Sequence, residues 1–551
     1  MDTTKRDFTE SLLKSDSPAL LILALAFGLR IWRAHGTFLN PDEAMHFLFA
    51  NQTSLAAAYR SSFSLFHPPL LQLLLYFWRH LGTSEFVLRV PSVLAGTAFC
   101  WLVFRWLQQI LGRTAGWIGL IFVSFLPPMI ALSAEVRQYA LLLAFAAGAA
   151  FFLEEALASQ SSVKMLGSSA FLWLALLTHY SAFLFAAAMG CYALVRIAQE
   201  RPRNRVVISW LIGQIIAVGI CAFLYVTHLS RLGAEVAASR GTQAFSSWYL
   251  PNSYFHRGEN PMAFAVARSF GVFQFLFGQN AVGDVAFLAF AVAVVLLLLR
   301  KKLPEQRISS RQLALLLVLP FAINCGAAMA RAYPYGGTRH SVFLAMFAVA
   351  GVSFSVAWFT KQKPDRALGI ALLIAGVCGL FGAPRRPYML RRDQARANMI
   401  EAIDTIHRRV APGGRIFVDY QTNFLLRYYL CPEVDPARIP FVGGIKTYDC
   451  SGYKVTMTSA EINIFTATIF LDEWRELIRQ EALKPTDSVW MVQAGWDIGL
   501  AQELAKLHEF KNLNAQSFGR NITIFELHAG QPMPTAGFIA PPAPAGPRRG
   551  A

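Results

Sequence analysis

A long series of apolar runs constrains this chain more than any other feature. A helix needs about 17–25 mostly apolar residues to cross a bilayer, where only internally hydrogen-bonded helices and closed barrels are stable. The sequence therefore predicts an α-helical polytopic membrane protein with about eleven transmembrane helices. The runs lie at 17–34, 88–107, 114–133, 136–156, 163–178, 180–198, 206–229, 282–300, 311–330, 339–359 and 366–383.

Two further apolar stretches are weaker candidates for membrane spans. Residues 67–81 are short and open with two consecutive prolines after a histidine, and residues 262–278 contain an arginine and two glycines. We expect both to form helices that lie in or against the membrane interface.

Basic residues between the runs predict the orientation of the chain. The formal net charge is +17 although only 15% of the residues are charged, and Lys and Arg gather in alternate short connections, as in cytoplasmic loops. Nucleic-acid binding does not fit, because these residues separate apolar spans instead of covering one soluble face. We expect a cytoplasmic tail at 1–16, a transmembrane domain at 17–383, and long outward loops at 35–87 and 230–281.

Beyond the last apolar run the sequence is typical of a small soluble domain. An odd number of spans places 384–538 outside the cytoplasm as an α/β domain, and the Pro-rich end at 539–551 is predicted to be disordered. Cys431 and Cys450 lie in this domain and could form a disulfide in an oxidising compartment. Periodicity predicts helices at 399–410 and 500–510 and strands at 415–420, 487–495 and 521–527.

An acidic pair, Asp42-Glu43, follows the first apolar run in the segment NPDEAMHF. A carboxylate near a low-dielectric surface is suited to act as a general base on a hydroxyl, and two adjacent carboxylates also suit a divalent cation. The same residues fit a helix N-terminus, with Asn40 as the N-cap and Pro41 at the first helical position. The two interpretations are compatible, and the pattern alone does not decide between them.

Four more polar segments fall at the outward ends of the predicted spans: HPPL at 67–70, SAEVRQYA at 133–140, THYS at 178–181 and RAYPYGGTRH at 331–340. Ionisable groups at the membrane edge are costly and are usually paired or functional. The candidate residues are His67, Glu135, Arg137, Tyr139, His179, Arg331, Arg339 and His340. Because the inward loops offer mainly Lys and Arg, this asymmetry predicts an active site on the outer face.

The RAYPYGGTRH segment has the composition of an anion site. Arg331 and Arg339 are suited to bidentate contacts with a phosphate, and Gly336-Gly337 permits close approach of the backbone. Structural alternatives remain for these segments. They are an ion pair within SAEVRQYA, a solvated histidine in HPPL, and an interfacial belt of aromatic and basic residues.

Together these motifs resemble the GT-C glycosyltransferases, in particular the protein O-mannosyltransferase-like and lipid A aminoarabinose transferase-like bacterial enzymes. A DE pair after the first span, then HPPL, then LR-x-PS-x-L-x-G is a specific combination, although each part alone is weak. The resemblance covers residues 20–200 well and 200–383 in topology, and the tail resembles no family. It rests on LRIWRAHGTFLNPDEA (29–44), FHPPLLQLLLYFWRHLGTSEFVLRVPSVLAGT (66–97), SAEVRQYALLL (133–143), THYS (178–181) and GTRHSVF (337–343).

The resemblance implies a GT-C fold in a bacterial inner membrane. It implies that a monosaccharide passes, with inversion, from a polyprenyl-phosphate carrier to a hydroxyl of a lipid, glycan or protein, without nucleic acid. Asp42 would be the general base, Glu43 would orient it, and Glu135, where several relatives have Asp, would bind the donor sugar or the acceptor. No cofactor is certain, although a divalent cation at Asp42 and Glu43 is compatible. The implied donor contacts are Arg137, Tyr139, His67, Arg339, His340 and His179.

Two other functions are compatible with a polytopic chain. A transporter or lipid flippase would be expected to show inverted repeats and charged or broken helices at mid-membrane, and neither pattern is visible in the sequence. A non-catalytic component of cell-surface polysaccharide export would use the tail as a binding module and would tolerate loss of Asp42.

Overall fold

The computed structural model of the chain separates into two compact units. The first contains the described residues up to Gly36, those from Phe49 to 231 and those from 250 to 382. The second combines Thr37–Leu48 with the described residues from 393 onward, so the acidic segment belongs to the same unit as the C-terminal domain. The described ranges are 17–65, 67–231, 250–361, 363–382, 393–431, 445–458, 467–496, 499–506 and 514–530.

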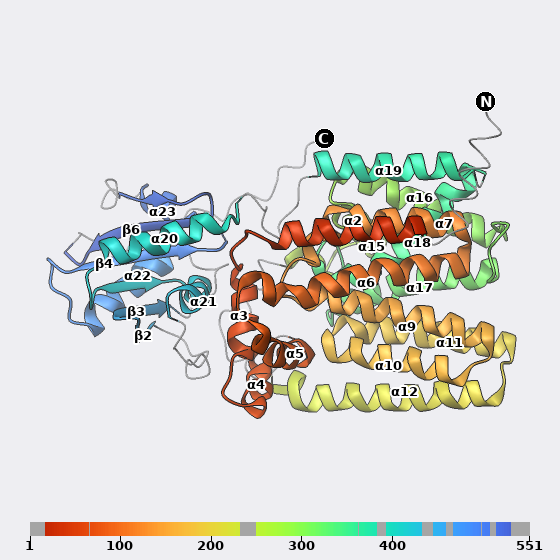
Figure 1. Ribbon diagram of the computed structural model, residues 1–551, viewed down its shortest axis with the longest axis horizontal. Helices are drawn as coiled ribbons and strands as arrows, with labels where there is room; N and C mark the ends of the chain where they lie inside the picture. Colours follow the sequence, from red (N-terminus) through yellow and green to blue (C-terminus); the bar gives the residue numbers. More distant parts are fainter. Residues whose placement is uncertain are drawn as a thin grey trace. The chain divides into compact units, whose positions relative to one another are not determined.

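The first unit is built from long apolar helices (Figure 1). Within the described ranges, nine of its helices are long and apolar enough to cross a membrane, which confirms the predicted multi-pass helical architecture. These helices are α2 (Ser17–Ala34), α6 (Glu85–Leu111), α9 (Tyr139–Ser159), α11 (Ser181–Glu200), α12 with the π-helical η3 (Asn204–Leu229), α16 (Asn280–Leu298), α17 (Ser310–Met329), η5 with α18 (Arg339–Phe359) and α19 (Pro364–Phe381).

Two of the predicted spans form shorter helices. The run at 163–178 is α10 (Ser162–Thr178), whereas the run at 114–133 is divided into α7 (Arg113–Phe125) and α8 (Pro127–Leu132). The division falls before two consecutive prolines, which lack a backbone N–H and crowd the preceding helical turn. The prediction of one continuous helix across 114–133 is therefore corrected.

Arg30 of α2 compensates for this break. In a continuous helix, the N–H groups of residues 127 and 128 would bond the carbonyls of Val123 and Ser124, but proline cannot donate. The fully buried Arg30 donates instead, from Nη2 to Val123 O at 3.0 Å and from Nη1 to Ser124 O at 3.3 Å. One guanidinium group thus satisfies the carbonyls that the proline pair leaves open, and it joins α2 to α7.

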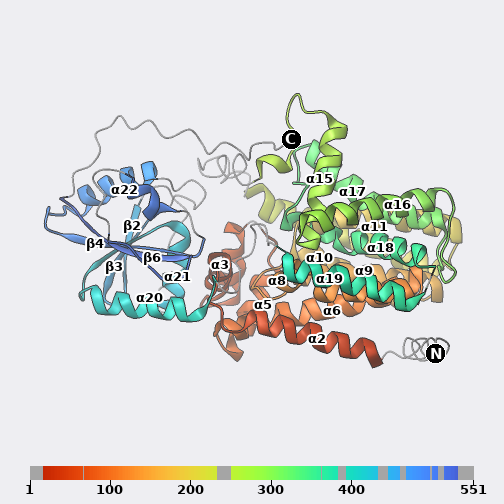
Figure 2. The same cartoon turned by 90° about the horizontal axis from the view of Figure 1, so that it is seen from above.

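The two weaker apolar stretches also form helices. Residues 67–81 contain α5 (Leu70–Trp78) and η2 (Arg79–Leu81), and residues 262–278 contain α15 (Pro261–Phe277), which Figure 2 shows at a steep angle to α16 and α17. Their position at a membrane interface stays a prediction. The short elements α4 (Leu55–Ser61), η1 (Ser62–Ser64) and η4 (Pro251–Ser253) complete this unit.

The second unit contains a six-stranded sheet in the order β2-β3-β1-β4-β6-β5. The central strand β1 runs parallel to β3 and β4, so that Val418 lies opposite Met457 and Val492, and the outer pairings are antiparallel. Figure 2 shows α22 on one face and α20 and α21 on the other. The strands are β1 (Arg415–Val418), β2 (Ile445–Cys450), β3 (Tyr453–Thr458), β4 (Ser488–Ala494), β5 (Gln516–Ser517) and β6 (Ile522–His528). The helices are α3 (Pro41–Ala50), α20 (Arg396–Arg409), α21 (Tyr420–Tyr429), α22 (Ala467–Gln480) and α23 (Leu500–Leu504).

The sheet confirms the predicted α/β character of the tail. The three predicted strands correspond to β1, β4 and β6, and the first predicted helix to α20. The hairpin β2–β3 and the helices α21 and α22 were not predicted. Of the helix predicted at 500–510, only α23 is seen, and 507–513 fall outside the described residues. Cys431 and Cys450 form a disulfide, with their Cα atoms 5.1 Å apart.

Candidate functional site

The motif LRVPSVLAG in α6 fixes the turn at 133–138. Ser92 donates a hydrogen bond from Oγ to the carbonyl oxygen of Arg137 at 3.3 Å. One turn further along α6, a Cβ added to Gly96 would lie 2.1 Å from Oγ of Ser133, so this position requires glycine. The serine and the glycine of the motif therefore act by holding the turn that carries Arg137.

Six of the predicted site residues come together in the first unit, before the start of α5, at the start of α9, after the end of α10 and at the start of η5. The cluster is centred on the ring of Tyr139, which has Cζ of Arg137 at 5.6 Å and Cζ of Arg339 at 5.7 Å from its centroid. The ring of His179 lies 5.3 Å from that of Tyr139. These residues, termed the histidine–arginine cluster, are His67, Arg137, Tyr139, His179, Arg339 and His340.

Within this cluster, the rings of two histidines lie close to the ring of the third, His179. The rings of His67 and His179 are stacked with centroids 5.3 Å apart, and the ring of His340 lies 6.4 Å from that of His179. The hydroxyl group of Tyr139 is buried and makes no hydrogen bond with the described residues. Two guanidinium groups, three imidazoles and a phenol therefore surround one place, a composition suited to an anion with hydroxyl groups nearby.

The tautomer of His179 follows from its local geometry. The backbone N–H of Ser181 donates to Nδ1 of His179 at 3.2 Å, so Nδ1 is an acceptor and the proton of the neutral ring is on Nε2. Burial, together with the positive charges of Arg137 and Arg339, lowers the pKa of His179 to about 3. His179 is therefore a neutral side chain with a fixed N–H donor at Nε2.

A glycine contact sets the position of the RAYPYGGTRH turn. A Cβ on Gly337 would lie 2.6 Å from the carbonyl oxygen of Gly271 in α15, so the close approach predicted for Gly336-Gly337 is made to α15. In the same turn, Tyr333 donates from its hydroxyl to the carbonyl oxygen of His340 at 3.3 Å, and their rings are 6.4 Å apart. Tyr333 is thus a member of the site that the sequence had marked only as part of an aromatic belt.

Two other predicted residues have different surroundings. Arg331 is exposed and donates from Nε to the carbonyl oxygen of Phe255 at 3.1 Å, which supports a role in holding the loop. Glu135 is 3% exposed, and its carbonyl oxygen accepts the N–H of Arg137 at 2.8 Å. Its proposed contact with the donor sugar or the acceptor stays a prediction.

The acidic pair lies in the second unit, in the first turn of α3. The N–H of Asn40 donates to Oε2 of Glu43 at 2.8 Å, and Oδ1 of Asn40 accepts the N–H of Glu43 at 3.0 Å. This reciprocal capping box confirms the capping interpretation for Glu43, which is fully buried. Asp42 is partly exposed, so it is the member of the pair with a solvent-accessible side chain.

The chemistry of these groups does not by itself require a metal. Among the residues that the structure describes, no group of three or more His, Cys, Asp or Glu side chains is placed to hold a metal ion. The divalent cation that Asp42 and Glu43 could bind therefore has no third ligand of these types within the same ranges.

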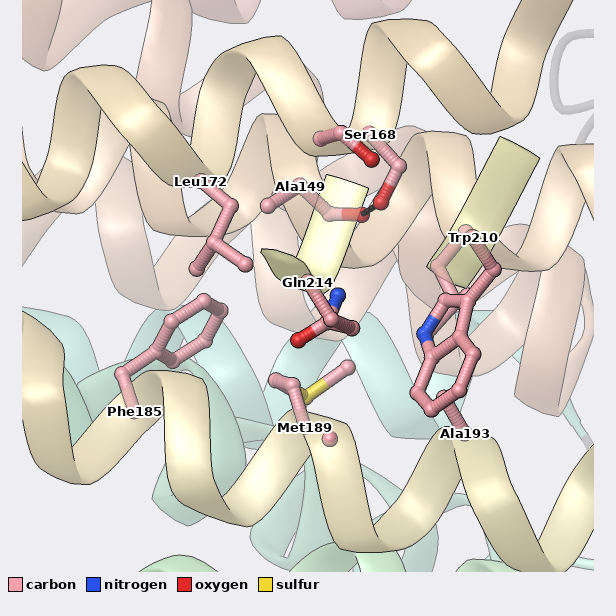
Figure 3. A pocket seen from close by; sticks show the side chains of 11 residues that line it. Ala149, Ser168, Leu172, Phe185, Met189, Ala193, Trp210 and Gln214 are labelled. Carbon is pink, nitrogen blue, oxygen red and sulfur yellow. Dashed lines mark hydrogen bonds between the residues drawn. The ribbon is translucent and has the colours of Figure 1, made fainter. Parts of the chain in front are cut away.

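A small cavity lies elsewhere in the first unit, among α9, α10, α11 and α12 (Figure 3). Its volume is about 20 Å³, which is room for one or two water molecules and too little for a sugar. Its lining is mainly apolar, with Gln214 and Ser168 among the polar exceptions. None of the predicted site residues lines it, and it is not the candidate site.

Comparison with known proteins agrees with the motifs. Residues 66–226, less than a third of the chain, match the family model of the dolichyl-phosphate-mannose-protein mannosyltransferases. This segment contains His67, Glu135, Arg137, Tyr139 and His179. No curated protein sequence matches the chain significantly.

Solved structures of three membrane enzymes are similar to the chain at low identity. ArnT from Cupriavidus metallidurans is 12% identical, with a TM-score of 0.49 over 94% of this chain and 99% of that one. The archaeal oligosaccharyltransferase AglB from Archaeoglobus fulgidus is 9% identical, with a TM-score of 0.43 over 86% and 69%. The arabinosyltransferase EmbB from Mycobacterium smegmatis is 14% identical, with a TM-score of 0.31 over 66% and 41%. Because these TM-scores are low, the resemblance is carried by the motifs and the family-model match.

Proposed function

We propose that the chain is a member of the GT-C superfamily of membrane glycosyltransferases and that it transfers one sugar from a polyprenyl-phosphate carrier to a hydroxyl group. The acceptor is a lipid, a glycan or a protein on the outer face of the membrane. The reaction proceeds with inversion at the anomeric carbon. The expected location is a bacterial inner membrane, with the N-terminus in the cytoplasm and the C-terminal domain outside it.

The convergence of Arg137 and Arg339 on Tyr139 is the observation that carries this proposal. Two guanidinium groups at a membrane edge stabilise the charge that develops on a departing lipid phosphate. The neutral His179 adds an N–H donor without adding a third positive charge. The hydroxyl of Tyr139, which makes no hydrogen bond with a described residue, supplies a further polar contact for the phosphate or the sugar.

Asp42 is the proposed general base. Its carboxylate takes the proton from the acceptor hydroxyl while the acceptor oxygen bonds to the anomeric carbon and the bond from that carbon to the phosphate oxygen breaks. The electrons of the broken bond stay with the lipid phosphate, which is already a competent leaving group. Glu43 is buried in the capping box, so it acts by shaping the turn that presents Asp42.

The competing functions lead to different expectations. A transporter or flippase would move the lipid-linked sugar without breaking the glycosidic bond, and an export component would not depend on Asp42. The matched family model and the arginine pair favour the transferase. Donor, acceptor and any need for a divalent cation are open to direct assay.

The test is transfer by the purified protein in lipid vesicles, with a panel of polyprenyl-phosphate sugars and mass analysis of the products. We expect Asp42→Asn to abolish transfer, a loss of about 10²-fold or more, while donor binding is retained. The control is Asp365→Asn, which changes an acid at the start of α19, outside both groups of site residues. Near-normal transfer by Asp42→Asn would remove Asp42 as the base.

A further inference from the structure

The sheet of the second unit has a topological switch point between β1 and β4. The chain leaves β1 through α21 toward β2 and β3, and it leaves β4 through α23 toward β5 and β6, so the connections of these neighbouring strands go to opposite sides of the sheet. Both β3 and β4 are parallel to β1, so the carboxyl ends of the three strands meet at one edge. In open α/β sheets, ligands bind at such a switch point, outside the carboxyl ends of the strands.

The first turn of α3 lies at this position. Gly495 follows β4 directly, and a Cβ added to it would lie 2.3 Å from Cγ and 2.8 Å from Cδ of Pro41. Gly495 also has φ of +100°, a conformation that L-residues rarely adopt. The backbone after β4 therefore touches the residue that begins the acidic helix, and there is no room for a side chain between them.

Three other residues fasten the same segment. The phenol oxygen of Tyr429 accepts the N–H of Leu39 at 2.8 Å, and the ring of Tyr428 meets that of Phe47 edge to face at 5.5 Å. The carbonyl oxygen of Gln394 accepts the N–H of Phe38 at 3.0 Å, and its side chain donates to Phe38 O and, at 3.3 Å, to Glu43. These clamp residues are Gln394, Tyr428, Tyr429 and Gly495.

The described polar groups that follow β1 and end β4 at this edge make hydrogen bonds within the domain. Asp419 follows β1 and accepts the N–H groups of Gln421 at 2.9 Å and Thr422 at 2.8 Å, which caps the helix end where a ligand phosphate would bind. The hydroxyl oxygen of Thr422 accepts the N–H of Ala494 at 2.8 Å. The N–H groups of Gln421, Thr422 and Ala494 are thus bound by the protein itself and not left for a ligand.

We infer that the C-terminal domain is a positioning module for the catalytic acid and not a ligand-binding domain. The first turn of α3 occupies the position where a ligand would bind. The clamp residues fix the backbone on both sides of Asp42. Asp42 itself is partly exposed between the buried Pro41 and Glu43. A misplacement of about 1 Å in a reacting group costs about 10²-fold in rate, which is why such a clamp affects the reaction. This inference rests on the proposed role of Asp42.

The test is a double-mutant cycle between Gly495 and Pro41 in the full-length protein. Gly495→Ala pushes Pro41 away, and we expect kcat to fall by about 10- to 100-fold with little change in the KM for the lipid-linked donor. Pro41→Ala removes the two atoms that the new Cβ would meet, so the double variant should recover most of the lost kcat. The control is Gly452→Ala, because Gly452 has φ of +85° and open space around its Cβ, and so shares only the backbone strain.

A milder variant guards against a failure to fold. Tyr429→Phe removes one hydrogen-bond acceptor, and we expect a fall of a few fold in kcat with an unchanged donor KM. If Gly495→Ala and Tyr429→Phe keep full kcat while Asp42→Asn is inactive, the positioning role is wrong and the proposed function stands. If Asp42→Asn is active, the proposed function fails first. If Pro41→Ala does not restore kcat, or Gly452→Ala loses as much as Gly495→Ala, the loss is general destabilisation and the inference is overturned.

Discussion

At the scale of single residues, the charge state of His179 decides what it can do. A histidine is often assigned as an acid or base because its ordinary pKa lies near neutrality. Here burial and two guanidinium groups lower that pKa to about 3, and the N–H of Ser181 occupies Nδ1. The proposed role that remains is a fixed donor from Nε2, which the amide of a glutamine can imitate and that of the shorter asparagine cannot.

This geometry predicts how two substitutions of His179 differ. We expect His179→Gln to keep much of the transfer activity and His179→Asn to lose about 10²-fold in kcat, because only the first retains a donor at the outer position. The pH profile of kcat between 5 and 8 should have the same shape in wild type and His179→Gln. A profile that loses its acidic limb in His179→Gln would show that His179 titrates during the reaction.

The lowered pKa of His179 also predicts a pH dependence of stability. Below an ordinary pKa of 6.5 the unfolded chain binds a proton that the folded protein does not bind until about pH 3. Folding therefore loses stability as the pH falls through this window. We expect the Tm of wild type to fall more than that of His179→Gln between pH 7 and pH 4.5, measured by thermal unfolding in detergent. Parallel Tm curves would contradict the assigned pKa.

At the scale of elements, the proline pair after α7 and the arginine of α2 form one structural device. Arg30→Met removes the guanidinium donors to both carbonyls, which leaves Val123 O with only the weak thiol donor of Cys100 and takes from Ser124 O its bond to Arg30. A buried carbonyl that loses its donor costs about 1–3 kcal/mol, so we expect a clear drop in Tm in detergent. The matched control is Arg203→Met, which changes an exposed arginine whose hydrogen bonds to described residues are made by its backbone, among them the one from its N–H to Gln160. Equal effects of the two variants would show that the arginine of α2 matters only as a charge.

Elements with a strong local pattern could be predicted from the sequence, and elements defined by distant contacts could not. The apolar runs, the α/β tail and the histidine–arginine cluster carry local signals of length, alternation or ionisable residues at span ends. The break between α7 and α8 coincides with two prolines. Because the residues around them are apolar, the sequence predicted one continuous helix. The hairpin β2–β3 was missed because its strands IKTYDC and YKVTMT carry charged residues among the apolar ones.

The association of the acidic segment with the tail had no local signal at all. It depends on pairs such as Leu39 with Tyr429 and Pro41 with Gly495, which lie far apart in the chain. Taken alone, each partner is typical of a common local structure: Leu39 of a loop, Tyr429 of a helix and Gly495 of a turn. Only the folded second unit shows that a single glycine is required at position 495, and why.

At the scale of the whole molecule, the proposed function requires the second unit, which contains the proposed base, to lie outside the cytoplasm. The disulfide between Cys431 and Cys450 favours a tail outside the cytoplasm, because cytoplasmic thiols are kept reduced. The basic inner connections favour the same orientation.

This orientation leads to a test with tags at both ends of the chain. Protease added to intact spheroplasts should remove a C-terminal tag and leave an N-terminal tag, because the predicted odd number of spans puts the ends on opposite sides. Lysed spheroplasts, in which both tags should be lost, are the control. The released tail should carry the Cys431–Cys450 bond, so that thiol alkylation labels these two cysteines only after reduction. A protected C-terminal tag, or a tail alkylated without reduction, would place the domain in the cytoplasm and with it the proposed base on the wrong side for a lipid-linked donor displayed outside.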